Sequence, residues 1–516
     1  MAKLKEVNLI DALGAGVGHI YAGLDRRRGC RPYFGWDPIG GSASHSFADT
    51  PHVVGRFLDV LGLCAGIFDM PVDEQAVKGL TKLMAQSLAR GAGFAWSDVP
   101  WGKQIKGIAA AMHDQREALL ALVALMTWRR SRRAAQLAQR LVDRIERTTR
   151  KTGNYPGRVL TRSGWLPEPQ GPDFDSTTTI GRLVGALVKY YRASGNSTAL
   201  VAARRFADYQ LEHCFDADGH VLEPAGTHLH SICGTCSGLI DLGILEHDHS
   251  YVEAGRKIYD VGLRPYRTSY GWVKESRSGQ HGRGEPNNTA DVVEAALYLG
   301  QAGHPAYFED AEVMVRNLLL RCQIHRTDWV GDGGGKEDTS ETMYKGVRQK
   351  IRGAFYFPTP NDFNSYNTDL TGAVMQGLCE AWHATTRHTD GRVWVDMLFT
   401  RRDESAHVRS RLPESGRVQI DLKRAAGLAV RIAPWIDRAR LKATLNGRPA
   451  KGRFGGHYLV FDGLPRGAKV KLTFPQPVRR SAERAAGWPH TYRLKWIGNT
   501  VESIRPKGKI CPLFEE

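Results

Sequence analysis

The sequence predicts a mainly α-helical protein, an (α/α)6 barrel of six helical hairpins, followed by a C-terminal antiparallel β-sandwich. Three observations predict this fold: a helical hairpin that repeats along the chain, enough further helices to complete six pairs, and a change to strand-like alternation after Gly391. At 516 residues the chain is long enough for two or three domains. We therefore expect residues 1–390 to form the barrel and residues 391–516 the sandwich, with residues 1–9 able to pair with the sandwich.

The repeated unit consists of an amphipathic helix, a tight polar turn and a second amphipathic helix. It occupies residues 182–211, 237–263 and 291–320. Apolar residues recur in each unit at intervals of three and four, which is typical of a helix with one buried face. The turns are centred on Gly195, Asp248 and Gly303, at intervals of roughly 54 residues, and repeated helical hairpins are the simplest explanation.

Further helices are expected on both sides of the repeats. They lie near residues 9–24, 50–68, 73–91, 104–127, 129–150 and 367–386. With the helices of the repeats they make about twelve, that is, six hairpins. Hairpins of this length can stack as an open solenoid, but six of them also close into a double ring of inner and outer helices. Closure would leave one end of the ring as a funnel lined by loops.

The predicted loops between the helices are unusually long. They are Asp25–Ala48, Thr152–Ser176, Asp216–Ile232, Arg264–Asn287 and Ile324–Tyr366. Loops longer than about 12–15 residues are commonly functional in compact domains. These loops are rich in Trp, Tyr, His, Asp, Glu and Asn, and treating them as surface decoration would leave their exposed aromatic residues unexplained.

After Gly391 the pattern changes to short segments in which polar and apolar residues alternate, such as RVWVDMLFT and RVQIDLK. Turn sequences such as NGRP and RGAK separate these segments. A series of short alternating strands with turns between them predicts an antiparallel sandwich.

The chain carries a formal charge of +17, with 71 Lys and Arg against 54 Asp and Glu. Such an excess can attract nucleic acid, anionic lipid or acidic polysaccharide. The densest basic run begins at Trp128, and there arginines alternate with Leu137, Leu141 and Ile145 at helical spacing. Because no aromatic residue is interleaved to stack on bases, a solvated helix face is the better interpretation, and we expect no nucleic-acid partner.

The sequence shows no signal-peptide pattern and no apolar run near the roughly 20 residues that cross a bilayer. Its eight cysteines are sparse, which favours buried reduced thiols. The single CxxC, Cys233 to Cys236, lacks the second half of a structural zinc site. We therefore expect a cytoplasmic protein with no membrane partner, and leave open a homodimer.

A funnel ringed by aromatic and carboxylic residues suits carbohydrate, and glycoside hydrolysis commonly uses two carboxyl groups. We take Glu275 and Glu285 as this pair. Glu285 stands just before a predicted helix, whose free N–H groups would hold a carboxylate ionised and in position. A plain helix-capping role is an equally good interpretation of Glu285.

Other polar and aromatic residues of the same loops are expected to contact the substrate. They are Trp36, His228, His230, Trp272, Asn287, Asn288, Asp291 and Asp362. His228 and His230 could be metal ligands or a proton-transfer pair, but loop histidines are more often hydrogen-bonded structural or substrate contacts. Asp362, Asp369, Asp173 and Asp175 precede predicted helices and are further carboxylate candidates, against turn and N-cap roles.

The order of segments resembles the β-L-arabinofuranosidase family of glycoside hydrolases, within the six-hairpin glycosidase superfamily. The resemblance runs over most of the chain and is clearest in GEPNNTADVVEAALYLG, NTDLTGAVMQGLCEAW and LAVRIAPWIDRARLKATLNGRP. It implies an (α/α)6 barrel with C-terminal β-sandwich structure and an enzyme that processes carbohydrate. In that family a zinc ion is held by one Glu and three Cys, and one of these Cys is the proposed nucleophile.

Carried over by position, the zinc-binding Glu of the family falls on Glu285, which is retained. The three thiolate positions fall on Asn287, Ala373 and Val374, none of which can supply a thiolate. We therefore expect no cofactor, although the resemblance itself implies zinc. The separate acid/base Glu of the family matches Glu275 only loosely, because the spacing here is shorter.

The leading hypothesis is a metal-independent glycoside hydrolase that acts on oligosaccharides in the funnel through a pair of carboxyl groups. A polysaccharide lyase acting on an acidic glycan is an alternative, because the positive charge would suit an anionic substrate. A second alternative is a degenerate barrel that binds glycan without turnover, which the missing cysteines motivate.

Overall fold

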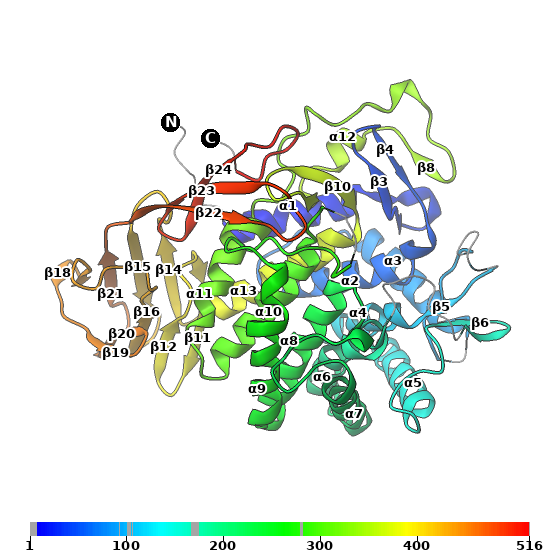
Figure 1. Cartoon of the computed structure of the whole chain (residues 1–516), viewed down its shortest axis with the longest axis horizontal. Helices are drawn as coiled ribbons and strands as arrows, with labels where there is room; N and C mark the ends of the chain where they lie inside the picture. Colours follow the sequence, from blue (N-terminus) through cyan, green and yellow to red (C-terminus); the bar gives the residue numbers. More distant parts are fainter. Residues whose placement is uncertain are drawn as a thin grey trace.

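The computed structural model describes residues 8–91, 93–100, 105, 107–166, 175–278 and 282–514. It is rich in helices, with several sheets toward the C-terminus, as the sequence predicts (Figure 1). The predicted pairing of residues 1–9 with the sandwich falls almost entirely outside the described residues, as does Asp173. Among the helices that are described, none is both long and apolar enough to cross a bilayer.

Six helices form a closed ring in which each helix contacts the next and the sixth contacts the first. In ring order they are α2 (His52–Ala65), α4 (Gln115–Thr127), α6 (Leu183–Ser194), α8 (Leu229–Glu246), α10 (Pro286–Gln301) and α13 (Asp369–Thr385). We call them the inner helices. Almost every residue of α8, α10 and α13 is buried, because these helices have neighbours on all sides.

Each inner helix packs against one outer helix next to it in the chain or, for α13, against the first helix of the chain. The outer helices are α1 (Leu9–Ala22), α3 (Glu74–Ala89), α5 (Arg132–Thr149), α7 (Ser197–His213), α9 (His249–Lys257) and α11 (Tyr307–Met314). Two of the predicted turns explain how hairpins form. Gly195 ends α6 in the left-handed conformation, and the Asp248 side chain caps α9.

The basic helix α5 has the solvated face that its sequence predicts. Leu137, Leu141 and Ile145 are buried against the ring, while most of the interleaved arginines stay exposed or half-buried. A helix with one apolar stripe and one charged face is typical of the outer layer of a globular protein.

The long segments before α2 and α13 are partly ordered into a five-stranded sheet of order β8-β4-β3-β10-β9. Its strands are β3 (Gly35–Asp37), β4 (Ser42–Ser44), β8 (Thr342–Met343), β9 (Phe357–Pro358) and β10 (Phe363–Asn367). The sequence predicts these segments as irregular loops. They pair because α2 and α13 are neighbours in the ring, so the chain enters both helices at adjacent places.

The C-terminal region contains two sheets that share one hydrophobic core, to which Val395, Val430 and Phe461 contribute from one sheet and Ile420 and Leu472 from the other. The first is β11 (Thr386–Thr389), β12 (Arg392–Val395), β16 (Ala426–Arg431), β20 (Tyr458–Leu464) and β19 (Arg453–Gly455). The second is β13 (Arg401–Arg402), β14 (Ala406–Ser410), β15 (Arg417–Leu422), β21 (Lys469–Thr473), β17 (Lys442–Leu445) and β18 (Arg448–Pro449).

The purely antiparallel prediction is wrong at one place, where β12 pairs with β16 in parallel. After β12 the chain leaves to build part of the second sheet and then returns in the same direction, so a parallel pair results. The last strands, β22 (Val478–Arg484), β23 (Thr491–Ile497) and β24 (Thr500–Arg505), form a separate sheet. Leu494, Trp496 and Ile504 of this sheet belong to the core of the helices, along which the sheet lies (Figure 1).

A buried ionic network fixes the sheets to the ring. Arg431 of β16 donates hydrogen bonds of 2.7 Å to both Glu309 and Glu312 of α11. Glu312 also accepts from Arg316 and from the backbone N–H of Leu398. Because these groups are largely buried and satisfied by one another, separating the sheets from the helices would expose unpaired charge.

Candidate active site where the inner helices begin

Every inner helix contributes a buried polar residue at or just before its first turn. These residues are His52, Asp114, Arg182, His230, Glu285 and Asp369, in ring order. The sequence separates them widely, and the closed ring brings them to one end. We call this group, with His113, His228 and Asn287, the polar cluster.

The contacts of the polar cluster run around the ring and close on themselves. His52 contacts Asp114 at 3.2 Å on one side and Asp369 at 3.7 Å on the other. Asp114 also accepts from His113 at 2.9 Å, and the His113 ring lies 5.9 Å from that of His228.

The other half of the polar cluster lies at the starts of α8 and α10. His228, His230 and Glu285 bring their ligand atoms within 4.8 Å of one another. Asn287 completes the circle, donating to Glu285 at 2.9 Å and contacting Asp369 at 3.3 Å.

Below the cluster a single buried carboxylate faces three arginines. Glu117 of α4 lies 3.2 Å from Arg116 and 3.3 Å from Arg56, and it accepts a short hydrogen bond from Arg182. Burial acts to raise the pKa of Glu117, but the three guanidinium groups outweigh burial and hold this pKa well below its ordinary value. Glu117 is therefore ionised, and its three arginine neighbours give this part of the site an excess of positive charge.

The histidines of the cluster are in different charge states. Burial acts to lower the pKa of His52, but hydrogen bonds to Asp114 and Asp369 outweigh it and raise this pKa to about 9. Burial, reinforced by Arg182, lowers the pKa of His113 to about 4. Burial together with neighbouring positive charges also lowers the pKa of His228 and of His230 well below the ordinary value. Near neutral pH His52 is cationic and the other three are neutral imidazoles.

The two predicted carboxyl groups, Glu275 and Glu285, lie near one another but in contrasting surroundings. Burial, together with the negative charges of Glu275 and Asp369, raises the pKa of Glu285 well above its ordinary value. Glu275 is less buried and accepts two hydrogen bonds from the Arg283 guanidinium, at 2.7 and 2.5 Å. Arg283 is itself held by Ser365 and by the ring of Phe357.

Glu285 occupies the N-cap position of α10, but its side chain makes no capping hydrogen bond. The capping interpretation of Glu285 is therefore wrong, and so is the expectation that the free N–H groups of the helix hold its carboxylate ionised. Pro286 occupies the first turn of the helix, where a missing N–H costs nothing, and the Glu285 carboxyl group turns toward Asn287 instead.

The predicted contact residues of the α10 segment surround Glu285. Asn288 donates to the backbone oxygen of Lys274 at 2.7 Å, which ties the segment that carries Glu275 to the start of α10. Asp291, one turn along the helix, lies 3.2 Å from His230. Within the described part of the chain, the buried amide oxygens of Asn287 and Asn288 have no hydrogen-bond partner. Buried acceptors of this kind suit the hydroxyl groups of a ligand.

Three other predicted substrate contacts have partners within the protein. Trp272 is fully buried, and its indole N–H donates to the backbone oxygen of Pro358. Trp36 is buried in β3, where its indole N–H donates to the oxygen of Tyr33. Asp362 accepts backbone N–H groups near Ile510 and anchors the C-terminal segment. The structure thus gives these side chains packing and anchoring roles, because long loops fold back on the protein and bury their aromatic residues.

The thiolate zinc site implied by the family resemblance does not fit the donor set of this chain. Asn287 offers only an amide, and Ala373 and Val374 offer no ligand atom. Cys233 and Cys236 are buried in α8, where burial raises the pKa of each thiol, and Cys236 donates to the oxygen of Gly255. These positions therefore cannot hold zinc through thiolates.

Several residues of the site were missed by the sequence analysis. They are His52, Arg56, His113, Asp114, Glu117 and Arg182. Asp369 was considered only as a further carboxylate candidate. For His52 and Arg182 the available signal was a polar residue at the start of a predicted inner helix. His113, Asp114 and Glu117 gave no such signal, because the helix predicted over 104–127 begins only at Gln115.

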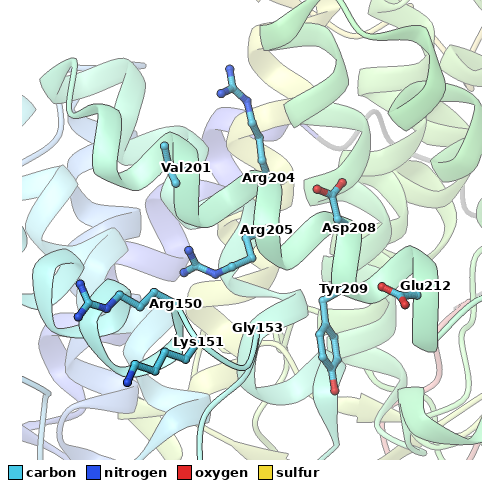
Figure 2. Close-up of a pocket in the computed structure, with 9 residues that line it drawn as sticks. All are labelled: Arg150, Lys151, Gly153, Val201, Arg204, Arg205, Asp208, Tyr209 and Glu212. Atoms are coloured by element: carbon cyan, nitrogen blue, oxygen red, sulfur yellow. The ribbon is translucent and has the colours of Figure 1, made fainter.

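A pocket of about 500 Å³ lies elsewhere, on the outer side of the ring between the end of α5 and α7 (Figure 2). Its lining side chains are mostly charged, and several are already paired. Arg205 binds Glu146, and Asp208 accepts from Tyr251. This pocket contains none of the histidines and carboxyl groups of the polar cluster, so we do not place the active site there.

No family model matches the sequence, and no curated protein matches it. Solved structures do match the fold. A GH127 β-arabinofuranosidase superimposes with a TM-score of 0.63 at 14% identity, covering 96% of this chain and 81% of the other. The chain has the fold of these enzymes. A GH127 β-L-arabinofuranosidase from Geobacillus stearothermophilus T6 gives 0.61 at 13% identity, over 96% of this chain and 80% of the other. A structure described as a glycoside hydrolase gives 0.59 at 12% identity, over 95% and 84%.

Proposed function

We propose that this chain is a glycoside hydrolase that cleaves oligosaccharides at the end of an (α/α)6 barrel where the inner helices begin, with Glu275 and Glu285 as its catalytic carboxyl groups. The observation that carries the proposal is the contrast between these two groups. Glu285 is buried beside other carboxyl groups, which favours its protonated form, whereas Glu275 pairs with a guanidinium, which binds a carboxylate.

Hydrolysis of a glycosidic bond needs one carboxyl group that donates a proton to the leaving oxygen and one ionised carboxylate that serves as nucleophile or activates water. Two carboxyl groups in contrasting environments meet this need. The contrast assigns Glu285 as the acid and Glu275, which is held by the Arg283 guanidinium, as its partner. Asn287 and Asn288 would then accept hydrogen bonds from sugar hydroxyl groups through their unpartnered oxygens.

The buried arginines favour hydrolysis over the lyase alternative. A lyase needs cations free to neutralise the carboxylate of an acidic sugar. Arg56, Arg116 and Arg182 all face Glu117 instead. Their excess charge still leaves an anionic glycan among the substrates to be tested.

The test is cleavage of a panel of glycosides and oligosaccharides that includes β-L-arabinofuranosides, because two of the matching structures carry that name. We expect Glu285→Gln and Glu275→Gln each to lower kcat/KM by about 10²–10⁴-fold on a substrate that the unmodified protein cleaves. Glu341→Gln is the matched control, since Glu341 is exposed and pairs with Arg28. Full activity in both site variants would contradict the assignment, and an unsaturated product that absorbs in the ultraviolet would identify a lyase.

A further inference from the structure

His228, His230 and Glu285 form a compact group of two imidazoles and one carboxyl group. Their ligand atoms all lie within 4.8 Å of one another. Small rotations about the side-chain torsions would bring all three within the roughly 2.0–2.2 Å at which nitrogen and oxygen ligands bind zinc. All three residues stand at the beginnings of the neighbouring helices α8 and α10, so rigid elements hold the group together.

Each member of this group uses one polar atom for a neighbour, which leaves another for a ligand. His228 contacts Ser231 Oγ through Nδ1 at 2.8 Å, which leaves Nε2. His230 places Nε2 3.2 Å from Asp291 Oδ2, a contact without hydrogen-bond geometry that a small rotation would complete, which leaves Nδ1. Glu285 accepts from Asn287 through Oε1, which leaves Oε2. Metal-binding histidines are typically oriented by a carboxylate or hydroxyl on their second nitrogen, and metal-binding carboxylates are likewise hydrogen-bonded.

We propose that His228, His230 and Glu285 bind a divalent transition-metal ion of the Zn²⁺ class. Two imidazole nitrogens and one carboxylate oxygen suit Zn²⁺ and Co²⁺, and three protein ligands leave a coordination position for water. This donor set differs from a thiolate site: it keeps Glu285 and replaces sulfur with nitrogen from α8.

A second group, His52, His113 and Asp114, also brings its ligand atoms close together and serves as an internal comparison. Here both histidines direct Nδ1 at the same oxygen of Asp114, at 3.2 and 2.9 Å. The atoms that face one another are therefore already joined by hydrogen bonds. The two groups make different predictions, because in the second group both histidines are already hydrogen-bonded to its one carboxylate.

A metal ion bound at this site would affect activity. This effect rests on the proposed function, whereas metal binding itself does not. Glu285 is the proposed acid, and a metal ion bound to its carboxyl group would block the approach of the leaving oxygen. Bound Zn²⁺ is then expected to suppress glycoside cleavage, and a chelator is expected to restore it.

The experiment adds Co²⁺ and Zn²⁺ to the full chain after dialysis against a chelator. We expect visible absorption bands of Co²⁺ in a nitrogen and oxygen site, one ion per chain by calorimetry, and displacement of Co²⁺ by Zn²⁺. His228→Gln and His230→Gln should each weaken binding by at least about 100-fold, and Asp291→Asn by about 10–100-fold. His113→Gln, which alters the comparison group, should leave binding unchanged.

Two outcomes would overturn the proposal: absence of Co²⁺ bands in the unmodified chain, or equal binding in the His228→Gln and unmodified chains. Loss of binding in His113→Gln alone would move the site to the comparison group. Circular dichroism identifies variants that fail to fold, and the unmodified chain remains a test in that case. Metal binding without glycoside cleavage would contradict the proposed function only.

Discussion

The substitution Glu117→Gln tests the electrostatic design of the ring without any knowledge of the substrate. Glu117 has no exposed side-chain surface and faces the guanidinium groups of Arg56, Arg116 and Arg182. Removing one partner of a buried ion pair costs about 3–5 kcal/mol, because the remaining charge stays buried and unpaired. The amide keeps the shape of the side chain and one acceptor oxygen. We therefore expect the free energy of unfolding to fall by about 3 kcal/mol, near the lower end of this range.

The assay is urea unfolding followed by circular dichroism, with Glu341→Gln as the matched change at an exposed ion pair. Exposed pairs contribute about 0–1 kcal/mol, so the control should keep the unfolding midpoint almost unchanged. Adding Arg182→Met to Glu117→Gln should recover part of the loss, since it removes one of the unpaired charges. A loss in Glu117→Gln no larger than in the control would refute the conclusion that this carboxylate balances the three arginines.

Two further predictions concern stability. The pKa of His52 is raised to about 9, and a shift of this size corresponds to about 3 kcal/mol of stability. The stabilisation by His52 is therefore fully present below pH 6.5 and is lost as the pH rises through 9. His52→Asn should flatten the alkaline part of a plot of melting temperature against pH, and an unchanged slope would contradict the charge assigned to His52. Gly55→Ala would place a methyl group 2.7 Å from the backbone oxygen of Glu117, where α2 and α4 approach closely, and should cost about 1–3 kcal/mol. Gly14→Ala, in α1 with no atom within 4 Å, should instead stabilise by up to about 1 kcal/mol, and equal effects of both changes in urea unfolding would contradict the close packing of the ring.

The helices could be predicted from the sequence because their signals are local. Gly195 ends a helix in a conformation that favours glycine, and Asp248 caps the next one, so the hairpin period is visible in the chain itself. The pairing of β3 with β10 could not be predicted in this way, because these strands lie far apart in the sequence and meet only when the ring closes.

The site was predictable only in part. Glu275, Glu285, His228 and His230 stand in loops or at helix starts, where polar residues attract attention as functional candidates. Glu117 lies in the first turn of α4 but in the middle of the helix expected over 104–127, and there a carboxylate that faces the ring interior looks the same as one that faces water. The burial of Trp272 was also not predictable, because an aromatic residue in a long loop looks exposed until the loop folds over it.

The acid role of Glu285 is the central claim, and the pH dependence of glycoside cleavage tests it most directly. Burial and the neighbouring carboxyl groups raise the pKa of Glu285, so kcat/KM should stay high at pH values where an ordinary carboxyl group has lost its proton, and should fall on the alkaline side. Glu285→Gln should remove this alkaline limb along with most of the activity, whereas Glu341→Gln should keep both. An alkaline limb that persists unchanged in Glu285→Gln would contradict the account.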